Sequence, residues 1–339
     1  MEALLIDEWL RGLDPVFVID EASLTLVRDR IKQVAAEHGV VGEIVDRAVL
    51  VATELGRNHL RHARSGRIAA NVIQRGGHQG LELVAVDRGA GLVDVAGSID
   101  ALPRTEGTLG LGIGSIRRLS SEVDFDVRAG EGTGIRARLF DRTASRRREV
   151  GIFGTPHREE RVSGDHARAH RVEGALVLAV CDGLGHGPLA REAAAAAMAI
   201  FDERPDDSPS GIIEKCHRRL ADTRGVVMAI CRLDEVTATM EVVVVGNIEV
   251  QVCAPRAVRR LGGVSAIVGG RGGPRLRLRT ERVPVREDEV VIAATDGISS
   301  RLSVEQDFPL LRMHPAVIAQ RIMERFARAN DDALVLVAR

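Results

Sequence analysis

The polar run RTASRRRE at residues 142–149 is the feature that most restricts how this chain can fold. It has no hydrophobic periodicity, and it stands between two strand-like segments, 134–140 and 150–153. A chain of 339 residues is long enough for two domains of roughly 100–200 residues, each with its own core. The sequence therefore predicts an N-terminal domain over 1–140, a linker over 141–149 and a C-terminal domain over 150–339.

Charge and hydropathy exclude several classes of function. The chain has 47 basic and 48 acidic side chains, so no overall field attracts it to nucleic acid or to anionic lipid. Its longest apolar run, residues 193–201, is far shorter than the roughly 18 residues of a membrane span. The acidic N-terminal segment also lacks the basic start of a signal peptide. We expect a cytoplasmic protein without nucleic-acid or membrane partners, and its four widely spaced cysteines to be buried thiols.

Hydrophobic periodicity predicts an α+β pattern in both halves. In the N-terminal half we expect a helix over 23–38, capped by Ser23, and further helices over 42–62 and 115–121. Strands are expected there at 68–74, 81–87, 124–128 and 134–139. In the C-terminal half we expect strands at 176–180, 226–232, 239–245, 249–252, 290–294 and 334–337, with helices at 188–203, 210–222 and 315–329.

The first group of chemically informative residues lies in the N-terminal half. Glu54 and Asn58 are four residues apart on a predicted helix, so a carboxylate and a carboxamide share one face. The segment DRGAG at 87–91 ends a predicted strand, and GTLGLGIG at 107–114 opens a helix, where backbone N–H groups can hold phosphate. Taken singly, an exposed helix pair and glycine-rich loops are ordinary features, and only their order is informative.

Together these segments resemble the N, G1 and G2 boxes of the GHKL ATPase superfamily, and specifically its small serine-kinase branch that regulates anti-sigma and stressosome switches, over about residues 16–140. The resemblance implies a Bergerat α/β sandwich that binds ATP and Mg²⁺. It makes Glu54 the catalytic base, Asn58 the magnesium ligand and Asp87 the reader of adenine. Ala90 departs from the pattern, because many relatives have proline there. The other nucleotide contacts that the resemblance implies are Gly89, Gly91, Gly107, Thr108, Gly110, Leu111, Gly112, Gly114 and Thr133.

The second group consists of acidic residues at predicted strand ends, namely Asp165, Asp182, Asp296 and Asp331 with Asp332. Any one Asp-Gly pair is usually a turn. Several carboxylates in this pattern are instead the oxygen ligands that hard divalent cations prefer.

The segments that carry these acids, SGD, DGLGHG, VVGN, TDGI and DDALVLV, closely resemble the type 2C metal-dependent phosphatases, in particular the sporulation and stressosome serine phosphatases, over about residues 150–339. The resemblance implies an αββα sandwich with two Mn²⁺ or Mg²⁺ ions. Asp182 would bridge both ions and be the central catalytic residue, joined by the Gly183 carbonyl and by Asp165, Asp296 and Asp331. His186 is either a proton donor to the leaving serine or a packing residue, and no motif selects Arg158 or Arg161 as a phosphate ligand.

Both resemblances together imply a bifunctional regulator of a bacterial stress-response or sigma-factor switch. It would phosphorylate and dephosphorylate STAS-domain antagonist or stressosome proteins on serine or threonine. A sigma factor or a downstream phosphatase is a further candidate partner, and a homodimer is compatible with this interpretation. The alternative is a phosphatase whose GHKL domain only binds a partner in an ATP-dependent way.

Overall fold

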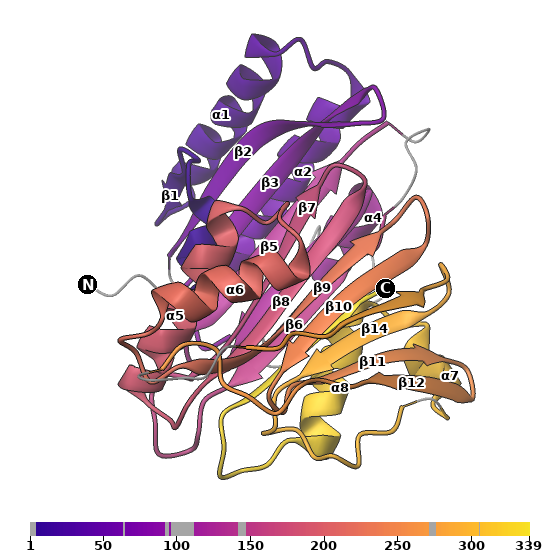
Figure 1. Ribbon diagram of the computed structural model, residues 1–339. Helices are drawn as coiled ribbons and strands as arrows, with labels where there is room; N and C mark the ends of the chain where they lie inside the picture. The colour runs from indigo at the N-terminus through magenta and orange to yellow at the C-terminus, as the bar shows by residue number, and fades with distance from the viewer. Residues whose placement is uncertain are drawn as a thin grey trace. The chain divides into compact units, whose positions relative to one another are not determined.

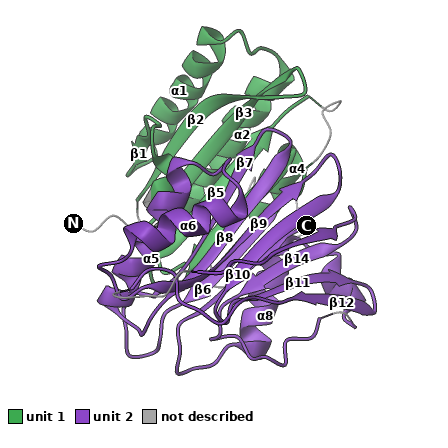
Figure 2. Cartoon of the chain, in the orientation of Figure 1, with its two compact units in different colours: residues 1–149 green, residues 150–339 purple. Residues whose placement is uncertain are grey.

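The computed structural model describes residues 5–63, 65–91, 95, 112–141, 147–270, 276–304 and 306–339. The chain forms two compact units, residues 1–149 and 150–339 (Figures 1 and 2). Each unit combines β-strands with helices, which confirms the predicted α+β class. Four of the predicted nucleotide contacts, Gly107, Thr108, Gly110 and Leu111, lie outside the described residues.

Unit 1 is built on antiparallel strands in the order β1-β2-β3-β5-β4. Helices α1 (Ser23–Glu37) and α2 (Glu43–Asn58) pack on β2 and β3 and on each other, and α4 (Ile113–Leu119) packs beside α2. Both longer helices bury apolar residues at helical spacing, which is what the sequence pattern predicts. The strands are β1 (Val16–Val18), β2 (Gly66–Arg75), β3 (His78–Asp87), β4 (Glu122–Arg128) and β5 (Gly132–Leu139).

The start of α1 and the end of α2 differ from the prediction. Helix α1 is not capped by Ser23, because Ser23 is already its first helical residue. The N-cap is Ala22, which makes no side-chain cap hydrogen bond, and Asp20 Oδ1 accepts hydrogen bonds from the Ser23 amide at 2.8 Å and from the Ser23 hydroxyl at 2.6 Å. Helix α2 continues as a π-helical turn, η2 (His59–Ala63), a rare geometry that is frequent at functional sites.

An N-terminal 3₁₀ segment, η1 (Leu5–Leu10), is also part of unit 1. Its Trp9 and Leu10 are buried against Ala69 of β2 and against Val84 and Val86 of β3. The guanidinium carbon of Arg136 lies 4.5 Å from the centre of the Trp9 ring, a cation–π contact. The only tryptophan of the chain is therefore part of the unit 1 core.

Unit 2 contains two sheets whose strands follow the orders β6-β15-β14-β11-β12 and β13-β10-β9-β8-β7, and the neighbouring strands in these orders pair antiparallel. The strands of the first sheet are β6 (Val150–Thr155), β15 (Ala333–Ala338), β14 (Val290–Ala294), β11 (Glu249–Ala254) and β12 (Ala257–Leu261). Those of the second are β13 (Thr280–Pro284), β10 (Thr239–Val245), β9 (Val226–Asp234), β8 (Ala175–Gly183) and β7 (Asp165–Val172).

Three hydrophobic clusters define the layers of unit 2. One joins inward-facing residues of the two sheets, such as Ile152 and Leu178. A second packs the β8–β10 sheet against α5 (Pro188–Glu203) and α6 (Pro209–Arg219). The third packs the other sheet against α7 (Phe308–Leu311) and α8 (Pro315–Phe326), which are visible in Figure 1. The arrangement is the αββα sandwich that the sequence predicts.

The cysteines agree with the sequence-based expectation that they are buried thiols. All four cysteines are buried, and none forms a disulfide. In the parts of the chain that the structure describes, every helix is too short or too polar to cross a membrane.

Candidate active sites

A small pocket in unit 1 brings together five of the seven predicted nucleotide contacts that the structure describes, namely Asn58, Asp87, Gly89, Gly91 and Thr133. It lies where α2, the η2 turn, the end of β3 and the start of β5 meet. Gly112 precedes α4 as its N-cap, and Gly114 is in its first turn, next to the pocket residue Ile113. The lining includes Leu55, Asn58, His59, His62, Asp87, Gly89, Ala90, Gly91, Ile113, Thr133 and Ile135.

Asp87 is held at the end of β3 by the backbone around it. Its Oδ1 accepts a hydrogen bond from the Gly89 amide at 2.8 Å, and Thr133 is its partner across the β3–β5 ladder. Burial raises the pKa of Asp87, while hydrogen bonds from Gly89 and Thr133 and the nearby His62 oppose that rise. Gly132 has a φ of +142°, and a Cβ there would overlap the Asp87 carbonyl oxygen. The glycine before the predicted contact Thr133 therefore allows a close approach of its backbone to the end of β3.

Asn58 fits a ligand-binding role. Its carboxamide nitrogen is buried, and it has no hydrogen-bond partner within the described part of the chain. A buried amide without a partner is costly unless a ligand or water satisfies it. The adjacent His59 is 3% exposed, and burial lowers the pKa of its imidazole to about 4. At neutral pH this imidazole is therefore uncharged and does not offset the negative charge of a bound nucleotide.

Glu54 is placed differently from the other predicted residues, because it does not line this pocket. It is buried on α2, and its Oε1 accepts a hydrogen bond from Arg57 Nη1 at 3.0 Å. Burial raises the pKa of Glu54, and the hydrogen bond and charge of Arg57 partly offset the rise. The carboxylate that the resemblance makes a base is thus already paired with an arginine.

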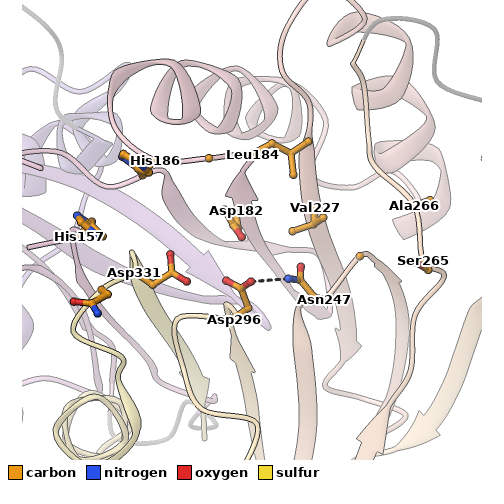
Figure 3. Close-up of a pocket in the computed structure, with 13 residues that line it drawn as sticks. His157, Asp182, Leu184, His186, Val227, Asn247, Ser265, Ala266, Asp296 and Asp331 are labelled. Carbon is orange, nitrogen blue, oxygen red and sulfur yellow. Dashed lines mark hydrogen bonds between the residues drawn. The ribbon is translucent and has the colours of Figure 1, made fainter. Parts of the chain in front are cut away.

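The larger pocket belongs to unit 2, has a volume of about 650 Å³ and contains three of the predicted acids (Figure 3). Asp182 comes from the end of β8, Asp296 follows β14, and Asp331 precedes β15. The remaining lining residues are His157, Leu184, Gly185, His186, Val227, Gly246, Asn247, Ser265, Ala266 and Asn330.

Asp165 lies deeper than these three. It is 1% exposed, faces Asp182 across the β7–β8 ladder, and accepts a hydrogen bond from the Thr295 hydroxyl at 2.7 Å. Burial and the neighbouring Asp182 raise the pKa of Asp165 well above the usual value. Burial, Asp296 and Asp331 raise the pKa of Asp182 to about 7. Such mutual repulsion is what bound divalent cations would relieve.

The donor set fits hard divalent cations that keep much of their water. Among the described residues, no group of three or more His, Cys, Asp or Glu side chains lies close enough together to hold a metal ion. Carboxylates around an open pocket suit Mg²⁺ or Mn²⁺, since Mg²⁺ usually retains several waters. Gly183, whose carbonyl is a predicted ligand, is the last residue of β8. It packs so closely on α5 that a Cβ at position 183 would overlap the carbonyl oxygen of Ala190.

The structure also identifies residues that sequence reasoning left without a role. Asn247 donates a hydrogen bond to Asp296 Oδ2 at 2.7 Å, shown dashed in Figure 3, and thereby orients that carboxylate. Asp332 does not line the pocket. Its carboxylate instead accepts hydrogen bonds from the backbone amides of His157 at 2.6 Å and Gly164 at 2.8 Å. The VVGN segment after a strand was the available signal for Asn247, whereas His157 carried none.

Comparison with known protein families agrees with both halves. Residues 17–139 match the family described as histidine kinase-like ATPase domain, and residues 172–339 match the family of stage II sporulation protein E (SpoIIE). Over 122 residues the chain is 31% identical to the serine/threonine-protein kinase RsbT of Bacillus subtilis (strain 168), covering 36% of this chain and 92% of that protein. The chain belongs to the family of this kinase over its N-terminal half, and its C-terminal half matches the SpoIIE family. It is therefore a fusion of a GHKL-type kinase-like domain with a SpoIIE-type, type 2C-like serine phosphatase domain, as predicted.

Other relatives of this fusion support the phosphatase half. The phosphoserine phosphatase RsbX of the same strain is 27% identical over 128 residues, which cover 37% of the chain and 61% of RsbX. A structure from work on the bacterial stressosome shares 32% sequence identity at a TM-score of 0.52, covering 57% of this chain and 99% of that one. The structure of RsbX in complex with magnesium has a TM-score of 0.51 at 19% identity, covers 57% of this chain and 96% of that one, and shows the shared fold.

Proposed function

We propose that the fusion is a bifunctional regulator that adds phosphate to, and removes it from, serine or threonine of STAS-domain partner proteins. The observation that carries this proposal is the presence of two separate pockets, each lined by several of the residues that its own family pattern requires. One contains Asn58 and Asp87, and the other contains Asp182, Asp296 and Asp331. The similarity to RsbT and to a structure from the bacterial stressosome supports a partner of the stress-response switch.

In the phosphatase half, the proposed ion-binding groups are Asp182, Asp296, Asp331, the Gly183 carbonyl and the deeper Asp165. Divalent cations bound there would neutralise phosphate charge and supply an activated water. The protein's own part is to hold the carboxylates in place. Asn247 orients Asp296, and Thr295 orients Asp165, so each of these carboxylates keeps a fixed orientation before any substrate arrives.

In the kinase half, we assign Asp87 to adenine, Asn58 to Mg²⁺ and the glycine amides of the pocket to phosphate. The buried carboxamide nitrogen of Asn58 has no partner among the described residues and is a hydrogen-bond donor, so it supports an acceptor such as a phosphate oxygen at this point, while Mg²⁺ would bind the carboxamide oxygen. Glu54 would deprotonate or orient the acceptor hydroxyl, a role that typically contributes about 10²–10⁴-fold.

One observation favours the alternative, in which this domain binds ATP and a partner without transferring phosphate. Arg57 holds the Glu54 carboxylate at 3.0 Å, and Glu54 is outside the described pocket lining. A base that is engaged by an arginine is weaker until that contact opens. If this domain is a kinase, substrate binding must therefore release the Glu54 carboxylate from Arg57.

The deciding experiment uses full-length protein whose phosphatase site is silenced by Asp182→Asn and Asp296→Asn, so that product accumulates. In that background, Glu54→Gln should keep ATP affinity and lose transfer of labelled phosphate to a STAS-domain protein, whereas Asn58→Ala should lose both. Asp46→Asn, an exposed acid on the same helix, is the matched control and should change neither. ATP-dependent binding of the partner without labelling would replace the kinase proposal by the binding-module alternative.

A further inference from the structure

The phosphatase pocket has an apolar part beside the proposed ion-binding acids. The acids lie near the centre of Figure 3, and Leu184, Val227 and Ala266 lie above and to the right of them. We call these three residues the apolar wall. The pocket volume of about 650 Å³ is within the range of about 300–1,000 Å³ that encloses drug-sized ligands, so the few atoms of a phosphoseryl side chain do not fill it. The wall is therefore available to a second part of the substrate.

The apolar wall adjoins the proposed ion site directly. Val227 of β9 is the Cα partner of Asp182 of β8, and such partners lie about 4.5–5.5 Å apart with their side chains on the same face of the sheet. Leu184 follows Asp182 by two residues, and its amide donates a hydrogen bond to the Gly225 carbonyl at 3.2 Å. An extended peptide advances about 3.3 Å per residue. If the phosphate is bound at Asp182, a side chain one or two residues from the phosphoserine reaches the wall.

Backbone hydrogen bonds hold the third residue of the wall on both sides. Before Ala266 in the chain, the Val264 carbonyl accepts a hydrogen bond from the Gly246 amide at 2.9 Å. After Ala266, Val268 and Val226 exchange two hydrogen bonds, of 2.8 and 2.9 Å. A surface that is already fixed loses little conformational freedom when a ligand binds. The wall is thus a preformed binding surface.

The chemistry of the wall selects what it can bind. Its side chains are aliphatic, so a charged or polar side chain placed against them would lose water without gaining a hydrogen bond. An aliphatic side chain would instead gain from the burial of its own apolar surface. Ile267, which follows Ala266, is 44% exposed and packs over Gly225, where a Cβ would lie 2.6 Å from Ile267 Cγ2. It extends the apolar surface beside the wall.

We propose that the apolar wall is a specificity subsite, which binds an aliphatic side chain one or two residues from the phosphoserine of the partner protein. The phosphatase then prefers phosphoserine segments with leucine, isoleucine, valine or methionine at this position, and it discriminates against aspartate or glutamate there. The inference rests on the proposed phosphatase function and names the class of segment on which that function acts.

The test uses the full chain with Mn²⁺ and phosphoserine peptides that differ only in carrying leucine or aspartate at one of the two positions on either side of the phosphoserine. At one of these positions, leucine should raise kcat/KM over aspartate by about 10-fold or more. Val227→Thr places a hydroxyl on the wall at nearly equal volume and should lower this ratio. Ala266→Arg should reverse the preference, because a guanidinium pairs with the aspartate. The ratio is the readout, so a general loss of activity does not imitate the effect.

Leu189→Ser is the matched control, because Leu189 of α5 is 53% exposed and lies outside the pocket lining. It should leave the ratio unchanged. The absence of a leucine preference at every tested position, or an unchanged ratio in both wall variants, would refute the subsite. Hydrolysis of p-nitrophenyl phosphate without hydrolysis of any peptide would refute it as well. Wild-type protein that is inactive on p-nitrophenyl phosphate and on all peptides would instead refute the phosphatase proposal itself.

Discussion

At the scale of single residues, Gly132 shows how closely the nucleotide pocket depends on backbone contact. A Cβ at this position would overlap the carbonyl of Asp87, so Gly132→Ala should push β5 away from the end of β3. We expect loss of ATP affinity, measured by calorimetry. Gly130→Ala is the control, because Gly130 also has a positive φ, +77°, but nothing lies within 4 Å of its Cβ position. The control should lose some stability through backbone strain and keep ATP binding. Equal affinities in both variants would contradict this explanation.

Asp20 is a second residue whose contribution can be isolated. Its hydrogen bonds from the Ser23 hydroxyl and amide lower the pKa of its carboxyl group. Because the folded-state pKa is lowered, the stabilisation is present above the ordinary value of 3.8 and is lost as the pH falls through the lower folded value. At neutral pH, Asp20→Ala should lower the melting temperature of unit 1, while Asp20→Asn should largely preserve it. The difference between wild type and Asp20→Ala should shrink in acid.

At the scale of elements, helix α5 depends on a stripe of small side chains. Ala190, Ala193, Ala194 and Ala197 are at most 1% exposed and pack the helix closely on the sheet that contains β8. Ala197→Leu should overfill this layer and cost about 1–3 kcal/mol of unfolding free energy. Ala199→Leu, on the exposed side of the same helix, has a similar helix propensity and should be nearly neutral. Denaturant titration of both variants measures the difference.

Elements with strong periodicity could be predicted from sequence, whereas polar and edge strands could not. The predicted strands 239–245 and 290–294 coincide with β10 and β14, because runs of valine and isoleucine fill a buried layer. Strand β7 reads DHARAHRV, which has no β-like pattern, and it exists because it pairs with β8 along its whole length. Strands β12 and β13 lie at sheet edges and are largely exposed. Because they bury little surface, their sequences need no alternation of apolar residues and show none.

The sites show a similar division between local and long-range information. Aspartates at strand ends could be found because they stand next to recognisable strands. The partners Thr295 and Asn247 meet their aspartates across 130 and 49 residues of sequence. The i, i+3 spacing of Glu54 and Arg57 already suggests that they form an ion pair. The burial of Glu54, which raises the pKa of its carboxyl group, depends on the tertiary fold and could not be predicted from this spacing.

At the scale of the whole molecule, the clustered carboxylates of the phosphatase pocket should lower the stability of the ion-free protein, because they repel one another. With a chelator present, Asp182→Asn should raise the unfolding temperature of unit 2 above wild type, because one of several mutually repelling carboxylates is gone. Adding Mn²⁺ should stabilise wild type by about 2.7 kcal/mol at 100 times the dissociation constant, and the variant much less. The exposed Asp222→Asn in the same unit should behave as wild type. Calorimetric scans that show the same Mn²⁺ response in all three proteins would refute the assigned ion site.

The packing of Trp9 makes the molecule its own optical reporter. The chain has one tryptophan and no tyrosine, and that tryptophan is 8% exposed in the core of unit 1 against Arg136. Indole emission therefore follows the ATPase unit alone, while far-ultraviolet circular dichroism follows both units. A denaturant titration recorded by the two methods should give coincident curves if the units unfold together. If they unfold separately, the emission shift should match only one of two dichroism steps, so that each unit's stability can be read from the unmodified protein.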